Sequence, residues 1–103
     1  MWNIEELTGY HPISTFYEDF SIADAFGLDA IKDTYERACK EWKHDYKMIT
    51  ELVMVLNHRC WLHYEHDRIE MSKLYCKLYY ELDDFCLNNL KGSELEYYIK
   101  TTD

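Results

Sequence analysis

The feature that most constrains the fold is an unbroken apolar run in the middle of the chain, Leu52-Val53-Met54-Val55-Leu56. Five consecutive apolar residues cover every side of a helix, so a helix that carries them must be surrounded by other elements. A buried strand is the competing interpretation. It is disfavoured because the flanks contain almost no turn-forming residues and the whole segment is too long for one strand. We therefore predict a central helix from Tyr46 to about His66, with Asp45 as its N-cap.

Caps and periodicity mark the other helices, because one Pro and three Gly are too few to supply the boundaries. The sequence Ser21-Ile22-Ala23-Asp24 has the form of a capping box, and Gly27 suits the left-handed residue that ends a helix. These signals predict a first helix of one or two turns within 14–26. A second helix, capped by Asp29, is predicted to end near His44, because apolar residues recur along it at helical spacing.

A fourth helix is predicted from 68–70 to Leu90, with Gly92 as its stop. Ser93-Glu94-Leu95-Glu96 has the form of another capping box and predicts a short last helix. Together these elements predict an all-α fold, a compact antiparallel bundle of three long helices plus two short ones. The residues expected in its core include Val53, Leu56, Cys60, Leu78 and Leu82.

A chain of 103 residues with 48% apolar content is expected to form one domain, 1–103, of which 1–13 is an irregular N-terminal segment. The longest stretches without a charge are too short to cross a membrane. The N-terminus lacks the basic region and apolar stretch of a secretory signal. We therefore expect a cytoplasmic protein without membrane association, whose four cysteines form no disulfide framework.

The net charge of −9 is unevenly distributed. Residues 1–31 hold six acids and no base, residues 32–80 hold eight acids and nine bases, and residues 81–103 hold six acids and two bases. A surface of this kind repels phosphates, so direct binding of nucleic acid is disfavoured. The acidic ends indicate either solubility alone or a protein partner with a basic surface.

Ten tyrosines are the strongest anomaly of the composition. Adjacent pairs on a helix project about 100° apart, so the tyrosines near the C-terminus cannot all point into one core. Exposed tyrosines are typical of interfaces, and the competing interpretation places them at the margin of a small core with the hydroxyl in water. The acidic, tyrosine-rich C-terminal block is the predicted partner-binding surface, formed by Tyr79, Tyr80, Glu81, Asp83, Asp84, Glu94, Glu96, Tyr97 and Tyr98.

His63 and His66 lie one turn apart on the central helix, where two imidazoles can face one ion. A zinc site needs three or four ligands, and the hydrolytic H-E-x-x-H spacing is absent. We therefore assign no metal, no cofactor and no catalytic residue, and keep a small metal-dependent enzyme as the alternative. The sequence leaves open whether Glu51 and Asn57, beside the apolar run, are buried hydrogen-bonded groups or face a loop.

Three stretches carry a resemblance to known proteins: 20–27, 51–57 and 89–92, the last of which reads Asn89-Leu90-Lys91-Gly92. From about Ile13 onward the chain resembles a group of small helical proteins of Firmicutes-type bacteria and their phages for which no activity is known. The resemblance implies a cytosolic bacterial or viral setting and carries over no catalytic residue. Small acidic phage proteins include inhibitors of host defence, an analogy of size, charge and setting.

These observations favour a non-enzymatic, acidic protein-interaction module. Its most specific form is a phage or mobile-element inhibitor of a nucleic-acid-binding host defence protein, anti-CRISPR-like by analogy. Two alternatives stay open. One is the metal-dependent enzyme that uses His63 and His66, and the other is a structural homo-oligomer.

The cysteine pattern generates a first testable prediction. Thiol titration in denaturant, on freshly isolated protein that has met no added oxidant, is expected to return all four thiols, because a reducing compartment keeps cysteines reduced. Recovery of only two would mean that a disulfide forms in the cell.

Overall fold

The computed structural model describes residues 12–102, which fold into five helices without a strand. These helices are α2 (Pro12–Phe26), α3 (Leu28–Trp42), α4 (Tyr46–Glu65), α5 (Ile69–Asn89) and α6 (Ser93–Thr102). The prediction of an all-α bundle is thereby confirmed for this part of the chain. Residues 1–11 of the predicted irregular segment lie outside the described residues, and Pro12 and Ile13 already belong to α2. Among the helices described, none is long and apolar enough to cross a membrane.

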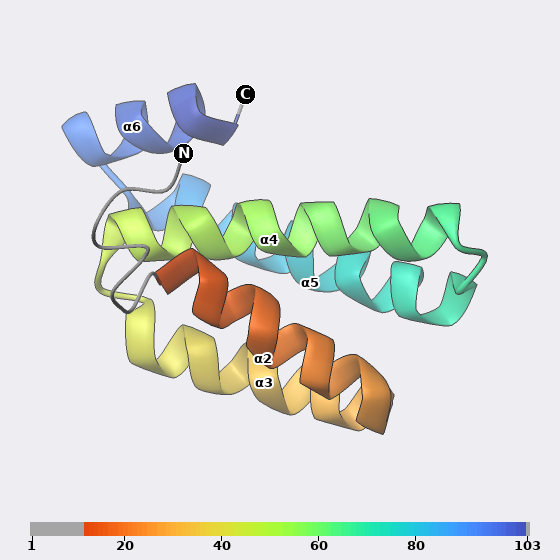
Figure 1. Ribbon diagram of the computed structural model, residues 1–103. Helices are drawn as coiled ribbons and strands as arrows, with labels where there is room; N and C mark the ends of the chain where they lie inside the picture. The colour runs from red at the N-terminus through yellow and green to blue at the C-terminus, as the bar shows by residue number, and fades with distance from the viewer. Residues whose placement is uncertain (1–11, 103) are drawn as a thin grey trace, which may run out of the picture.

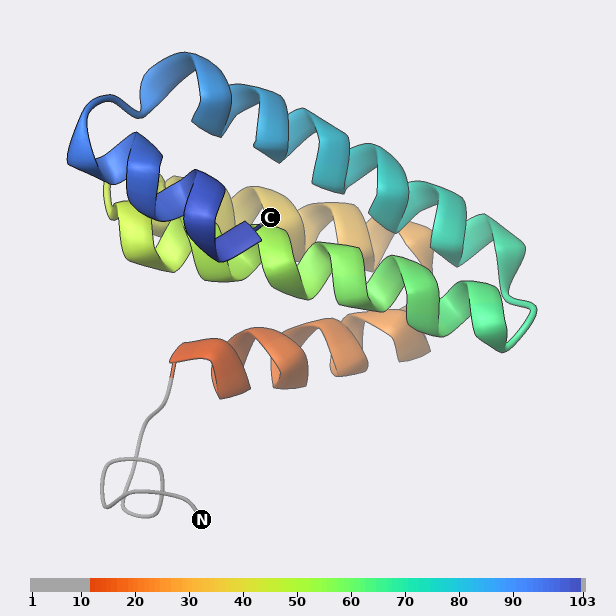
Figure 2. The same ribbon diagram turned by 90° about the horizontal axis from the view of Figure 1, so that it is seen from above.

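Helix α4 is the centre of the bundle, as the apolar run predicts. It contacts each of the other four helices. Figure 1 shows α2 and α3 as one hairpin and α4 and α5 as another, and Figure 2 shows α6 lying alongside the first half of α4. Helix α4 is thus covered by the α2–α3 hairpin, by α5 and by the C-terminal helix α6.

The apolar run is buried on all but one side. Leu52, Val53, Val55 and Leu56 are buried, whereas Met54 keeps 38% of its surface exposed. Leu78 and Leu82 of α5 are buried with them, as predicted, and Cys60 is half-buried at the edge of the same core.

Several helix ends follow the predicted signals. The Asp45 carboxylate accepts hydrogen bonds from the backbone N–H groups of Lys47 and Met48, each at 3.1 Å, and so caps α4. Gly27 separates α2 from α3 with φ of 112°, and Gly92 precedes α6 with φ of 60°. Both angles lie in the region that glycine adopts without strain.

The first helix departs from the prediction. The sequence from Ser21 to Asp24 is no capping box, because it lies inside α2, which begins at Pro12 and is as long as α3. Proline is favoured in the first turn of a helix, and Phe16, Phe20 and Ala23 bury a stripe at helical spacing that holds α2 on the core. Asp29 lies in the first turn of α3, whose N-cap is Gly27.

The core makes a prediction about stability. Leu56→Ala is expected to lower the free energy of unfolding by about 2 to 5 kcal/mol, because it leaves a cavity at a fully buried position. Met54→Ala, on the same helix but partly exposed, is the matched control and should cost about 1 kcal/mol or less. Urea denaturation measures both. Equal losses for the two variants would contradict the assignment of α4 as the central helix.

Candidate functional site

The most conspicuous polar feature is a buried cluster around Asp24 of α2. One carboxylate oxygen, Oδ2, accepts hydrogen bonds from the Arg59 guanidinium and from His63 Nε2, the latter at 2.7 Å. The other oxygen, Oδ1, accepts the Tyr75 hydroxyl at 2.5 Å. The side chains of Asp24 and Arg59 are only 13% and 9% exposed. One carboxylate thus joins α2 to α4 and α5.

The same cluster fixes the protonation of His63. Arg68 donates its Nε–H to His63 Nδ1 at 2.7 Å, so Nδ1 is an acceptor and the proton resides on Nε2. Burial lowers the pKa of His63. The Asp24 carboxylate opposes that shift, and the charges of Arg68 and Arg59 add to it. The ring stacks on Tyr75 with 5.4 Å between centroids, so His63 is a neutral, fully engaged side chain.

This geometry leaves His63 no free nitrogen for a metal ion or for proton transfer. His66 is exposed and is the C-cap of α4, away from this network. Within residues 12–102 no group of three or more His, Cys, Asp or Glu residues is placed to hold a metal. The two histidines proposed from the sequence are therefore not brought together on a common site.

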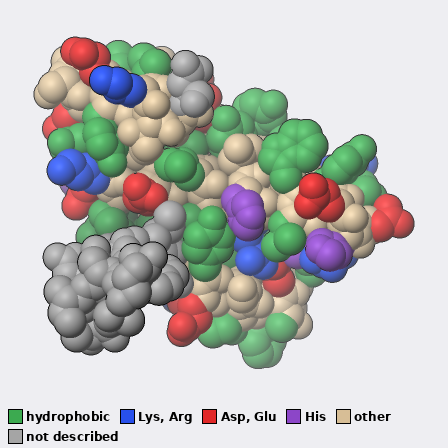
Figure 3. Space-filling view, turned by 45° about the horizontal axis from the view of Figure 1, so that its top comes forward, with side chains coloured by type: hydrophobic (Ala, Val, Ile, Leu, Met, Phe, Trp, Pro, Cys, Tyr) green, Lys and Arg blue, Asp and Glu red, His purple; other side chains and the backbone are tan. Residues whose placement is uncertain are grey.

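The residues predicted to bind a partner separate into two sets. Tyr80, Glu81, Asp84, Glu94 and Glu96 are exposed, with Tyr80 at 63%. Tyr79 and Tyr97 are half-buried, and Tyr97 packs edge-on against Tyr46. On the face drawn in Figure 3, acidic side chains are scattered among hydrophobic ones and do not gather into one acidic patch.

Tyr98 and Asp83 are less exposed than the sequence predicted. Tyr98 is 1% exposed, and its hydroxyl donates a hydrogen bond to the half-buried Asp83 carboxylate. This bond holds α6 on α5. The hydroxyl is satisfied inside the protein, and burial raises the pKa of Tyr98, so it stays a donor. Replacement of Tyr98 would therefore act on folding before it acted on binding.

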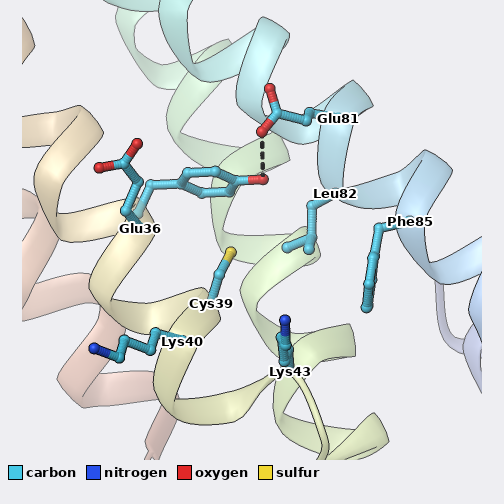
Figure 4. A pocket seen from close by; sticks show the side chains of 8 residues that line it. Glu36, Cys39, Lys40, Lys43, Glu81, Leu82 and Phe85 are labelled. Atoms are coloured by element: carbon cyan, nitrogen blue, oxygen red, sulfur yellow. Dashed lines mark hydrogen bonds between the residues drawn. The ribbon is translucent and has the colours of Figure 1, made fainter.

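A groove runs between α3 and α5, which both pack on α4 (Figure 4). Its largest hollow, about 440 Å³, has Tyr35, Cys39, Leu82 and Phe85 as apolar lining. A hollow of about 190 Å³ adjoins it and shares Tyr35, Glu36 and Glu81 with it. A third of about 410 Å³ shares Lys43 and Phe85 with the largest and reaches Glu94 of α6. The three hollows therefore follow one another along the line between α3 and α5, and we call them together the groove.

Charged side chains line the rim of this groove in bands. Lys32 and Lys77 border one end, Glu36 and Glu81 follow one turn later on their helices, and Lys40 and Lys43 come next on α3. The Lys43 ammonium group points toward the hollow, whereas Lys40 and Glu36 turn outward (Figure 4).

The floor of the groove contains two ionisable side chains, Tyr35 and Cys39. Across it, the Tyr35 hydroxyl donates to Glu81 Oε1 at 3.3 Å. Burial is the main cause that raises the pKa of Tyr35, and likewise of Cys39, so both remain protonated at neutral pH. A protonated thiol is a poor nucleophile. Neither Tyr35 nor Cys39 is therefore activated as a nucleophile.

Two of the predicted residues, Glu81 and Glu94, line this groove. The other residues that line it were not predicted from the sequence. On α3 the missed residues face a neighbour that is remote in sequence, so no local pattern identifies them. The Asp24 cluster was also missed, although an arginine, Arg59, inside the helix predicted to be central is a signal of a buried charge that needs a partner. Asn57 is exposed and Glu51 half-buried, and neither is placed in the cluster or the groove.

Comparison of the chain with known protein families, with curated proteins and with solved structures finds no match.

The Asp24 cluster predicts how stability depends on pH. The folded protein takes up the His63 proton at a lower pH than the unfolded chain, whose imidazole has its ordinary pKa of 6.5. Below that value the unfolded state binds more protons, so the free energy of unfolding is expected to fall as the pH drops, by up to about 1.4 kcal/mol per pH unit.

Urea denaturation between about pH 7.5 and pH 5.5 measures this slope. His63→Gln is expected to lose this contribution, whereas His66→Gln, at an exposed position, should keep the slope of the unmodified protein. The same slope in all three proteins would contradict the assignment of a neutral His63.

Proposed function

We propose that this chain is a protein-interaction module and that the groove between α3 and α5 receives an amphipathic helix of its partner. The observation that carries the proposal is the continuity of the three hollows along two helices, with an apolar floor and charged rims. A groove between two helices is a recurrent docking site for a helix that lays its apolar face into it.

The dimensions suit such a partner. From Lys32 to Lys43, the C-cap of α3, the groove follows eleven helical steps, about 16 Å at the rise of an α-helix, which matches three turns of a docked helix. Apolar side chains at successive turns of the partner would enter the hollows beside Tyr35 and Phe85. Aromatic residues in such a pocket are the usual anchors of binding energy.

The rim charges specify the partner further. Along α3 the bands are basic at Lys32, acidic at Glu36 and basic at Lys40 and Lys43. A complementary helix carries an acid, a base and an acid at successive turns on the flank that faces α3. On the flank that faces α5 it carries an acid opposite Lys77 and a base opposite Glu81.

The more specific role, inhibition of a nucleic-acid-binding defence protein, is one form of this proposal. Its support is the resemblance noted in the sequence together with the exposed carboxylates of Asp84, Glu94 and Glu96, which suit a basic partner surface beside the groove. The metal-dependent enzyme gains no such support, because both ring nitrogens of His63 are engaged within the protein.

A pair of synthetic helices tests the groove. Both are amphipathic peptides of about 18 residues with the same apolar stripe, since shorter isolated helices are marginally stable. One carries an acid, a base and an acid at successive turns. The other, the inverted peptide, carries a base, an acid and a base at the same positions. The first is expected to bind about tenfold more tightly, because three exposed ion pairs contribute a few tenths of a kcal/mol each. Added salt should reduce that preference.

A charge swap in the protein provides the decisive comparison. The triple variant Lys32→Glu, Glu36→Lys and Lys40→Glu keeps attractive pairs one turn apart, so α3 should remain folded, and it is expected to prefer the inverted peptide. The matched control, Asp33→Lys with Arg37→Glu, swaps an exposed ion pair of α3 that does not line the groove, and it should keep the original preference. Fluorescence anisotropy measures each affinity. Equal binding of both peptides, or an unchanged preference in the triple variant, would contradict the proposal.

The other candidate occupant is a second copy of the chain. Light scattering of the protein alone is expected to give the mass of a monomer. A stable dimer that Phe85→Lys dissociates would assign the groove to self-association instead.

A further inference from the structure

Helices α2 and α3 form a smaller hollow on the side of α3 that faces away from the groove. The two helices lie side by side and meet at Gly27 (Figure 1). Between them is a hollow of about 170 Å³, which we call the α2–α3 hollow. The residues of α3 that line it are not shared with the groove, because the two sets lie on opposite sides of that helix.

Two large apolar side chains at the border of the α2–α3 hollow are exposed. Phe26, the last residue of α2, is 80% exposed, and Ile22, one turn before it, is 53% exposed. Ala23 and Ala30 also line the hollow and add apolar surface. Exposed apolar side chains that gather beside a hollow are typical of a surface that contacts a partner. Phe26 and Ile22 therefore mark the α2–α3 hollow as a second contact surface.

The charge around this surface is negative. Asp19 lines the hollow, and α2 as a whole contains three acidic residues and no basic one. On α3, Arg37 lines the hollow but forms an ion pair with Asp33 at 3.0 Å, so these two charges offset each other. No cationic side chain of residues 12–102 forms an ion pair with Asp19. The surface therefore combines exposed apolar side chains with a net negative rim.

We propose that this surface binds a basic amphipathic helix of a protein partner, independently of the helix that occupies the groove. An apolar side chain of the partner enters the hollow beside Phe26 and Ala30, and a lysine or arginine pairs with Asp19. A second copy of this chain is disfavoured as the occupant, because it would bring two acidic α2 helices face to face. The chain would thus hold two different segments, one on each side of α3.

Two synthetic peptides of about 18 residues test this surface. Both carry the same stripe of leucines. The lysine peptide carries lysine on both flanks of the stripe, and the glutamate peptide carries glutamate at the same positions. Fluorescence anisotropy is expected to show that the lysine peptide binds at least about tenfold more tightly. In NMR spectra of the protein, the lysine peptide should shift the backbone amide signals of Ala23, Ala30 and Thr34, which line the hollow.

Matched variants locate the contact, since a lysine peptide is attracted to any acidic protein. Phe26→Ser should weaken binding about tenfold, whereas Leu87→Ser, which removes an apolar side chain of α5 that is 49% exposed, should leave it unchanged. Asp19→Lys is expected to weaken binding about fivefold more than Asp84→Lys, because the two variants change the net charge equally but only Asp19 lines the hollow. Circular dichroism checks that each variant is folded.

A variant of the groove separates the two surfaces. Phe85→Ser, which removes an aromatic side chain from the groove, should bind the lysine peptide as tightly as the unmodified protein does. Weaker binding by Phe85→Ser than by Phe26→Ser would overturn the proposal, and so would equal affinities of Phe26→Ser and the unmodified protein. A dimer of the protein alone that Phe26→Ser dissociates would also overturn it, because the occupant would then be a second copy.

Discussion

The Asp24 carboxylate is the contact on which the arrangement of the helices depends. It receives an arginine and a histidine from α4 and a tyrosine from α5 while it is itself part of α2. A buried ion pair contributes little net stability, because desolvation offsets the attraction, but an unpaired buried charge is costly. Any register of α2 that separates Asp24 from Arg59 leaves such a charge behind. The cluster therefore favours the register of α2 that keeps Asp24 beside Arg59.

A second feature of the packing is the groove. Helices α3 and α5 both pack on α4 and leave hollows between them (Figure 4). Only the Tyr35 hydroxyl reaches across the largest hollow to a carboxylate. A bundle organised around its central helix thus leaves a groove between two of the outer helices, and this groove is the proposed partner-binding site.

Local signals predicted those parts of the fold that depend on local chemistry. Asp45 caps α4 because its carboxylate reaches the first backbone N–H groups, and the apolar run identified the central helix. The same reasoning was wrong at Ser21–Asp24. The local pattern predicted a helix cap there, but Asp24 lies inside α2 and forms hydrogen bonds with side chains of α4 and α5. The expectation that Tyr98 is exposed was wrong for a related reason, since its hydrogen-bond partner Asp83 lies on another helix. The groove residues of α3 show no pattern of their own, because the groove exists only once α5 lies beside them.

The position of α4 in the chain has a consequence for synthesis on the ribosome. Its apolar run emerges after α2 and α3, which cover one side, but before α5 and α6, which cover the rest. For the time needed to translate about forty further residues, at about 5 to 20 residues per second, the nascent chain exposes this apolar run to solvent or to a chaperone. The many charged residues of α5 arrive just behind it, and the nascent protein becomes a closed bundle only when Tyr98 enters its place beside Asp83.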